Sequence, residues 1–243
     1  PQQPPHWQQI NSQIFNRKQT KTYFLSFFLP FLPHKMKNVL ATFQNIPVSS
    51  AAIVSIFPNI KAKSAKISQL EKANEIIRLK RNLFVTNPEE SGLALSTGLI
   101  ANHLLAPSYV SQQTALRHYG LIPEAVYTTQ SMTLKAAKTF NTAIGVFSYT
   151  HISKEAYAVG LRQEKDGNAN YIIASPEKAL CDLIATMQGV NLRYKKEALA
   201  FLEEDIRLDM ERFCHFNIQI FEEYMKFGKK ANSIATIIKL LDK

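Results

Sequence analysis

The excess positive charge of this 243-residue chain is confined to its first 87 positions. Residues 1–35 contain four basic side chains and no acidic one, and residues 36–87 contain eight basic and two acidic side chains. The rest of the chain contains 17 side chains of each sign. A basic segment attached to a neutral body indicates two modules, the first of which meets a polyanion. The alternative is a solvated basic face that has no partner.

The composition also narrows the class of protein. Cys181 and Cys214 lie far apart, without CxxC spacing or clustering with histidines, so the sequence predicts neither a disulfide framework nor a zinc site. No apolar run reaches the roughly 18 residues that span a bilayer. We therefore expect a cytoplasmic protein with no membrane partner. Because the chain has eight glycines and no Gly-rich phosphate loop, we also expect no cofactor.

The first 35 residues differ in character from the rest of the chain. They are rich in Gln and Pro, and their apolar patch "FLSFFLPFLP" is interrupted by Pro30 and Pro33. No small-residue cleavage site comes after the patch, as it would in a signal peptide. The first methionine is Met36. We expect residues 1–35 to be a non-native or disordered extension of a protein whose translation starts at Met36.

Residues 36–87 have the pattern of three short helices and a hairpin. In the third helix Ile67 and Leu70 are spaced to face inward. The stretch "EIIRLKRNLFVTN" then alternates apolar and polar residues on either side of a basic tip, which predicts a β-hairpin with Asn82 in its tight turn. This order of elements predicts a winged helix-turn-helix DNA-binding domain over residues 36–87.

In a winged helix-turn-helix domain the third helix lies in the major groove and the hairpin touches the adjacent backbone. Lysine and arginine suit phosphate contacts, and serine and glutamine suit base edges. The predicted DNA-binding residues are Lys61, Lys63, Ser64, Lys66, Gln69, Lys72, Arg78, Lys80 and Arg81. The alternative is that this domain docks a protein.

The second module, residues 88–243, mixes helices and strands. "AVYTTQSMT" and "IGVFSYTHIS" have strand character, and a hairpin is expected to turn at Asp166-Gly167. Ser175 and Pro176 mark the start of a helix, and residues 195–241 are expected to be helical. The predicted fold class is α+β: an N-terminal winged helix-turn-helix followed by a small α+β domain with a helical C-terminal tail.

Four segments of the chain resemble a known family. "PSYVSQQTALRHYGLIPEAVYTTQSMT", "FNTAIGVFSYTHIS", "IIASPEKALCDLI" and "FLEEDIRLDM", in this order, resemble the AbiEi antitoxins of type IV toxin–antitoxin (abortive infection) systems. The resemblance covers roughly Met36 to Leu241. It implies a transcriptional regulator that binds operator DNA at an inverted repeat upstream of its own operon. It also implies a C-terminal domain that counteracts a nucleotidyltransferase-like toxin without forming a stable complex.

The resemblance has one irregularity in the hairpin. Members of the family usually have "RGLYV", whereas this chain has "RNLFV" from Arg81 to Val85. Asn82 therefore takes a glycine position, and asparagine tolerates the positive φ of such a turn better than other non-glycine residues.

An enzymatic second module is the main alternative, as a nuclease or nucleotidyl-modifying enzyme delivered by the winged helix. A metal-dependent nuclease needs a carboxylate followed by Glu-x-Lys, but here Glu177 and Lys178 are adjacent. Lys178 and Asp182, at i and i+4, are predicted to form an ordinary helical ion pair. His151 is expected to be a hydrogen-bonded structural histidine and Cys181 a core residue. We therefore expect no catalytic residue, no metal site and no enzymatic activity.

The surface that would carry antitoxicity is predicted around the strip "YVSQQTALRHYG" and the strand and helix that come after it. Tyr109 and Ser111 are also expected to organise the turn and cap at the start of this strip. The candidate residues are Tyr109, Ser111, Tyr119, His151, Glu177, Lys178 and Asp182. A third possibility is that the whole chain is a protein-docking adaptor.

Overall fold

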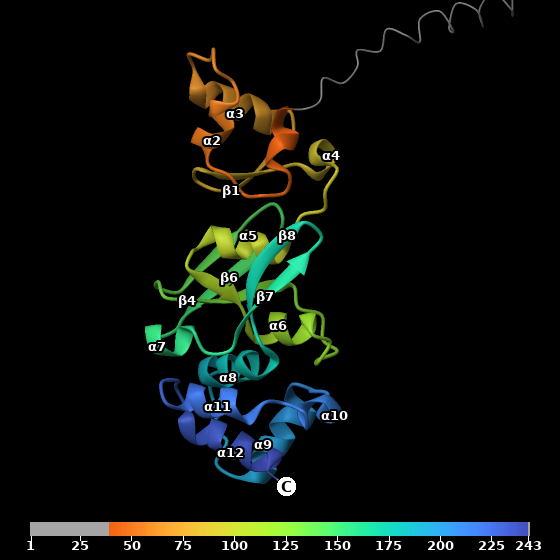
Figure 1. Cartoon of the computed structure of the whole chain (residues 1–243), viewed down its shortest axis with the longest axis vertical. Coiled ribbons are helices and arrows are strands. Elements are labelled where there is room, and N and C mark those ends of the chain that lie inside the picture. The colour runs from red at the N-terminus through yellow and green to blue at the C-terminus, as the bar shows by residue number, and fades with distance from the viewer. Residues whose placement is uncertain (1–38, 243) are drawn as a thin grey trace, which may run out of the picture. The chain divides into compact units, whose positions relative to one another are not determined.

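The computed structural model describes residues 39–242, so the extension expected over residues 1–35 lies outside the described residues (Figure 1). From Leu40 onward the chain forms one compact unit. Helices and strands are mixed along it, and the strands form a two-stranded and a six-stranded sheet. The fold class is α+β, as the sequence predicted.

The basic part of the described chain consists of short helices and a hairpin. The helix α2 begins after Ser49, whose side chain accepts a hydrogen bond from the backbone N–H of Ala52, so Ser49 is the cap. On α3, Ile67 and Leu70 are buried, as their spacing predicted. The elements are η2 (Val39–Phe43), α2 (Ser50–Ser55), α3 (Lys63–Lys72), β1 (Ile76–Lys80) and β2 (Leu83–Thr86).

The hairpin turns at Arg81 and Asn82. Asn82 has a φ of 63°, the left-handed conformation that the sequence predicted for it. Its side-chain oxygen accepts hydrogen bonds from the backbone N–H of Ser50, at 3.2 Å, and from the Ser50 hydroxyl. The turn is therefore tied to the start of α2.

Each face of the hairpin contributes side chains to a different hydrophobic cluster, since successive residues of a strand point to opposite sides. On one side Ile76 and Phe84 join the helical cluster, which consists of Leu40, Ile53, Ile67, Leu70, Ile76 and Phe84. On the other side Leu79 and Val85 belong to the larger main core. The hairpin thus divides two hydrophobic clusters, and its turn, with Arg81 and Asn82, is exposed.

The rest of the chain builds the six-stranded sheet and the helices around it. In the sheet the strand order is β5-β6-β4-β3-β8-β7, with parallel pairs β4/β6 and β3/β8 and the other pairs antiparallel. The elements are α4 (Pro88–Ser91), α5 (Thr97–Leu104), β3 (Ser108–Val110), α6 (Gln112–His118), β4 (Thr128–Thr133), β5 (Lys138–Asn141), β6 (Val146–His151), α7 (Lys154–Tyr157), β7 (Leu161–Asp166) and β8 (Ala169–Ala174), then α8 (Pro176–Thr186), α9 (Lys195–Ala200), the π-helix η3 (Phe201–Asp205), α10 (Met210–Phe213), α11 (Ile218–Met225) and α12 (Ala231–Leu241).

Helices cover both faces of this sheet. Ser108 on β3 donates to the carbonyl of Ala101 on α5, whereas the next residue, Tyr109, donates to Asp182 on α8. Because neighbouring strand residues point to opposite faces, α5 and α8 lie on opposite sides of the sheet. Figure 1 shows α5 and α8 on either side of the strands.

Helix starts and turns agree with the sequence signals. Ser175 caps α8 ahead of Pro176, Asn217 caps α11, and the β7–β8 hairpin turns at Gly167 with a φ of 60°. Strands β3 and β5 were not predicted. Within residues 39–242, no helix is long and apolar enough to cross a membrane.

Candidate nucleic-acid interface

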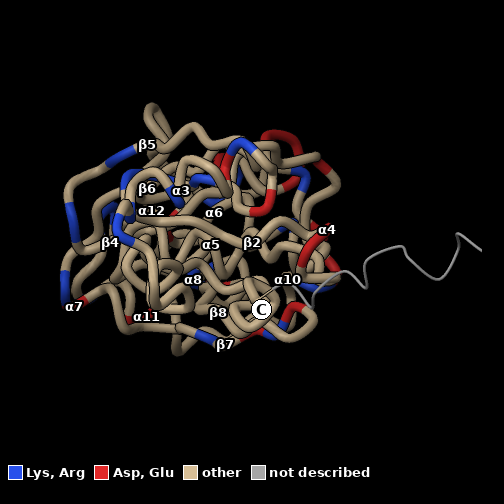
Figure 2. Tube along the Cα trace, turned by 90° about the horizontal axis from the view of Figure 1, so that it is seen from above, with Lys and Arg blue, Asp and Glu red and all other residues tan. Residues whose placement is uncertain are grey.

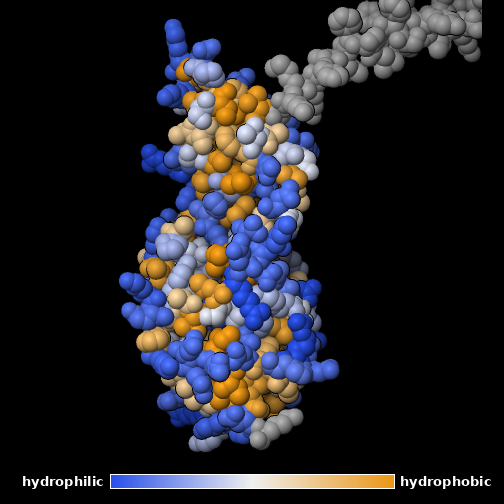
Figure 3. Space-filling model, in the orientation of Figure 1, coloured by the Kyte–Doolittle hydropathy of each residue, from blue (hydrophilic) through white to orange (hydrophobic). Residues whose placement is uncertain are grey.

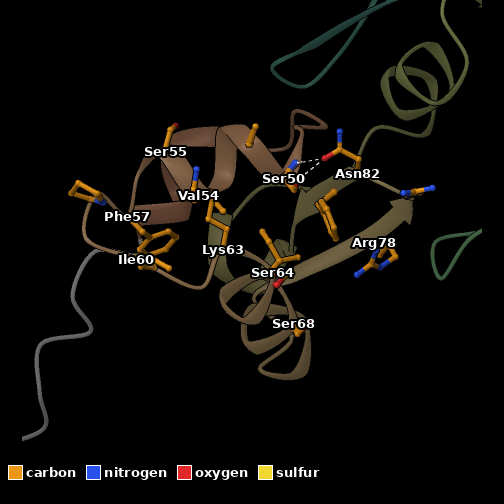
Figure 4. A pocket seen from close by; sticks show the side chains of 15 residues that line it. Ser50, Val54, Ser55, Phe57, Ile60, Lys63, Ser64, Ser68, Arg78 and Asn82 are labelled. Atoms are coloured by element: carbon orange, nitrogen blue, oxygen red, sulfur yellow. Dashed lines mark hydrogen bonds between the residues drawn. The ribbon is translucent and has the colours of Figure 1, made fainter.

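A groove of about 900 Å³ lies between α2, α3 and the hairpin. Figure 4 shows Ser50 and Val54 from α2, Lys63 and Ser64 from α3 and Arg78 from β1 arranged around it. Hydrophobic side chains form part of its lining, and Figure 3 shows such side chains on the surface over α2 and α3 with hydrophilic ones around them. The groove therefore offers both an apolar wall and polar contacts.

The charged residues of this lining are Lys63, Arg78 and Arg81, and the lining includes no carboxylate. Lys63 and Arg81 are exposed and form no ion pair in the described part of the chain. Four serines also line the groove: Ser50, Ser55, Ser64 and Ser68. Cations and hydroxyl groups without competing acids suit an anionic ligand.

Arg78 is less free than the other two cations. Its Nε donates to Glu71 Oε1 at 2.7 Å, and Nη2 donates to the second carboxylate oxygen of Glu71. The hydrogen bond to Glu71 raises the pKa of Arg78. The guanidinium also lies over the Phe84 ring, 4.8 Å from its centre. Arg78 thus joins α3 to β1 and forms a fixed wall of the groove.

The structure divides the predicted DNA-binding residues into two groups. Lys63, Ser64, Arg78 and Arg81 are brought together in the groove. The others lie outside its lining: Lys61, Lys66, Gln69, Lys72 and Lys80.

Two residues of the second group are held by neighbours. The Lys66 ammonium lies 4.7 Å from the centre of the Phe57 ring, so its side chain packs against the turn before α3. Lys80 does not extend from the hairpin tip as predicted. Its Nζ donates instead to the carbonyl of Leu104, at 2.6 Å, where α5 ends. A cation at the carboxyl end of a helix is favoured by the helix dipole, which explains this position.

Sequence reasoning missed several residues of the groove. Ser50, Ser55, Ser68 and Asn82 line it together with the predicted residues. Ser50 and Ser55 belong to α2, and only the folded arrangement brings α2 beside α3. Serines on a predicted short helix, next in sequence to a cationic helix, are the signal that could have identified them.

The second module contains a fully buried polar network around Asp182. The Asp182 carboxylate accepts hydrogen bonds from Tyr109 at 2.9 Å, Ser111 at 2.7 Å and Tyr224 at 2.9 Å. The Lys178 ammonium lies 4.0 Å from Asp182 Oδ1 and donates to the Ala156 carbonyl at 2.7 Å. The predicted i,i+4 ion pair is present, but it is buried rather than on a helix surface.

Burial and charge act in opposite directions in this network. Desolvation raises the pKa of Asp182 and lowers the pKa of Lys178, while the charge of each favours the ionised form of the other. Burial and the Asp182 carboxylate raise the pKa of Tyr109 and Tyr224, so both hydroxyls remain donors. The network joins β3, α6, α8 and α11 and acts as a structural element of the main core.

The predicted antitoxin surface therefore needs correction. Tyr109, Ser111, Glu177, Lys178 and Asp182 are buried, so a partner cannot touch them directly. Any effect they have on antitoxicity must pass through the packing of the core.

Ser111 stands at the cap position of α6, but its hydroxyl bonds to Asp182 and does not cap the helix, contrary to expectation. Glu177 accepts from the backbone N–H of Asn217 at 3.1 Å. Cys181 is a core residue, as predicted.

Two of the candidates remain accessible. His151 is exposed, and its Nδ1 lies 3.2 Å from the carbonyl of Lys135, so it is the hydrogen-bonded histidine that was expected. Tyr119 is half-buried, and its hydroxyl lies 3.5 Å from Glu164. Within residues 39–242, no group of three or more His, Cys, Asp or Glu side chains is placed to hold a metal ion.

Comparison with known proteins gives no family. No protein-family model matches the chain, and no curated protein sequence matches it. Among solved structures, the chain is similar to one described as "Crystal structure of RV2827C protein from Mycobacterium tuberculosis". The two share 12% sequence identity over 86% of this chain and 80% of that one, with a TM-score of 0.47. A likeness at this level supports no conclusion about function.

Proposed function

We propose that this chain is a DNA-binding transcriptional autoregulator whose residues 36–87 form a winged helix-turn-helix domain. The observation that supports this proposal most is the groove between α2, α3 and the hairpin. It gathers three cations and four serines and has no carboxylate in its lining. The confinement of the excess positive charge to the first 87 residues supports the same proposal.

In the proposed complex α3 enters the major groove and the hairpin tip meets the backbone. Ser64 and Ser68, on the groove side of α3, face base edges, because a hydroxyl can both donate and accept. Lys63 and Arg81 contact phosphates. Arg78, paired with Glu71, holds the angle between α3 and the hairpin and adds little free charge.

We propose further that the second module acts as the antitoxin of a type IV toxin–antitoxin system. This proposal rests on the sequence resemblance to AbiEi proteins across four segments of the chain. In it the module neutralises a nucleotidyltransferase-like toxin encoded beside it, without a stable complex.

DNA binding is tested by mobility shift with the duplex upstream of this gene. Replacing Lys63, Lys66 and Arg81 together with alanine should weaken binding at least tenfold at moderate salt and flatten its salt dependence, because phosphate contacts release counterions. The matched control replaces three exposed residues: Arg193, just before α9, and Lys195 and Lys196, at its start. Unchanged affinity in the first variant would refute the proposed interface.

Antitoxicity is tested by co-expressing the chain with the product of the neighbouring gene. We expect the wild type and the Lys63/Lys66/Arg81 variant to restore growth equally, while only the wild type represses a reporter behind the operon promoter. Failure of the wild type to restore growth would remove the antitoxin proposal and leave the DNA-binding proposal standing.

We propose no catalytic activity for the second module. The enzymatic alternative relied on Glu177 and Asp182, and both carboxylates are buried. Incubation of the protein with DNA, RNA and tRNA plus Mg²⁺ or nucleotide should give no product. A product formed by the wild type and lost in Asp182→Ala and Glu177→Ala would overturn this.

A further inference from the structure

A second basic region lies on the six-stranded sheet, outside the groove. Between Ala125 and Lys154, the stretch that forms β4, β5 and β6, the sequence has three lysines and no aspartate or glutamate. Lys135 and Lys138 are exposed, at the connection before β5 and at the start of β5. Strand β5 lies at the edge of the six-stranded sheet, so one side of its backbone pairs with no other strand of the described residues.

Two of the basic side chains of this region are held around one aromatic ring. The Lys138 ammonium lies 4.9 Å from the centre of the Phe140 ring, and the Lys80 ammonium lies 5.9 Å from it. Attraction to the ring face holds a cation in place. Lys80 is further fixed by its hydrogen bond to the Leu104 carbonyl. We call Lys80, Lys135, Lys138 and Phe140 the flank surface.

The charges of the flank surface act on one another. Burial lowers the pKa of Lys80, and the charges of Lys135 and Lys138 lower it further. None of the ion pairs formed within residues 39–242 includes any of these three lysines. Uncompensated like charges that lie close together raise the local potential and attract an anionic partner.

Lysine and arginine positions lie on several sides of the molecule, and the flank surface is on one of them. In the view of Figure 2 some of these positions lie along the chain beside the labels β5, β6 and α7, while the acidic positions beside α4 lie on the other side of the view. The flank surface adjoins the hairpin, because Lys80 belongs to β1 and its ammonium lies 5.9 Å from the centre of the Phe140 ring. Lys80 therefore connects the strand that leads to the Arg81 tip with the exposed lysines at the edge of the sheet.

We propose that the flank surface binds the phosphate backbone of the duplex that flanks the segment read by α3. This inference rests on the proposed DNA-binding function and extends the footprint from the hairpin to the edge of the sheet. Contacts of this kind carry no sequence information, but they fix orientation and add affinity. Lys135 and Lys138 supply the contacts, and Lys80 and Phe140 link this edge of the sheet to the hairpin.

The experiment compares full-length protein variants on nested duplexes from upstream of the gene, trimmed stepwise from either side of the protected segment. Lys135→Gln/Lys138→Gln should bind the long duplex about tenfold more weakly than wild type. Its plot of log affinity against log salt should be less steep by about 1.8, for two lost phosphate contacts. Trimming one flank of the duplex should lower the affinity of the wild type to that of the variant and leave the affinity of the variant unchanged.

The control is Lys195→Gln/Lys196→Gln, which removes the same charge from exposed positions on α9 and should leave both duplexes unaffected. The inference is overturned if this control loses as much DNA affinity as Lys135→Gln/Lys138→Gln. It is also overturned if Lys135→Gln/Lys138→Gln loses the same affinity on trimmed duplexes as on long ones. Unchanged DNA affinity with impaired toxin neutralisation overturns it as well and would assign the surface to a protein. In each of these cases operator binding persists, whereas a wild type that binds no duplex refutes the proposed function as well.

Discussion

Asp182 is the residue with the most partners in the buried network, and its removal has a predictable cost. Asp182→Ala leaves the buried Lys178 ammonium unpaired and removes the acceptor of Tyr109, Ser111 and Tyr224. Breaking a buried ion pair on one side costs about 3–5 kcal/mol of unfolding free energy. Tyr224→Phe removes one hydroxyl and should cost about 1 kcal/mol. Urea denaturation measures both, and equal losses would contradict the central role of Asp182.

The pKa of His103, in the last turn of α5, depends on the charge of Lys80, which belongs to the flank surface. Burial lowers the pKa of His103 below its ordinary value of 6.5, and the Lys80 charge lowers it further. Lys80→Met should therefore raise this pKa part of the way back, since the effect of burial remains. An NMR titration of the imidazole measures it. Lys72→Met, which removes a charge that does not act on His103, should leave the titration unchanged.

The same lowered pKa fixes the sign of a pH effect on stability. Because the folded state disfavours the protonated imidazole, the contribution of neutral His103 is fully present above the unfolded pKa of about 6.5. It is lost as the pH falls through the lower folded pKa. The loss should be smaller in Lys80→Met, and an equal loss would contradict the role of Lys80.

At the scale of elements, the hairpin turn depends on two separate properties of Asn82. Its backbone is left-handed, and its side chain binds Ser50 at the start of α2. Asn82→Ala loses the hydrogen bonds and meets strain of about 1–2 kcal/mol. Asn82→Gly loses only the hydrogen bonds, since glycine adopts this φ freely. Thermal unfolding should rank wild type above Asn82→Gly and Asn82→Ala lowest; equal losses would mean that backbone strain does not matter here.

Elements with local signals were predictable and elements without them were not. The start of α8 follows from Ser175 and Pro176, and the turn at Asn82 follows from residue type alone. Strand β5, "KTFN", is short and exposed at an edge, and β3 is a three-residue strand whose parallel partner β8 is far away in sequence. Their pairing depends on tertiary contacts.

The residues of the candidate groove were also only partly predictable from the sequence. Lys63 and Arg81 were identifiable by charge, because the basic residues are concentrated in one segment. The contribution of α2 to the groove was not, since Ser50 and Ser55 meet α3 only in the folded chain. Burial of Lys178 and Asp182 was equally hidden, because i,i+4 spacing is the same on a buried helix face and an exposed one.

At the scale of the whole molecule, the hairpin decides how independent the two predicted modules are. Phe84 belongs to the helical cluster, and its neighbour Val85 belongs to the main core. Because both clusters include residues of the same two strands, the unfolding of either cluster disturbs the hairpin. The boundary predicted at residue 87 therefore divides the sequence, while the packing runs across it.

This sharing predicts that the chain unfolds as one cooperative unit. Leu79→Ala, at a buried position of the main core, should cost about 2–5 kcal/mol. Hydrogen exchange in increasing urea should then show a lower midpoint in α3 as well as in α8. Ile67→Ala, in the helical cluster, serves as the reciprocal variant and should lower both midpoints too. If Ile67→Ala lowers the midpoint of α3 alone and Leu79→Ala that of α8 alone, the modules are independent domains and the hairpin does not couple them.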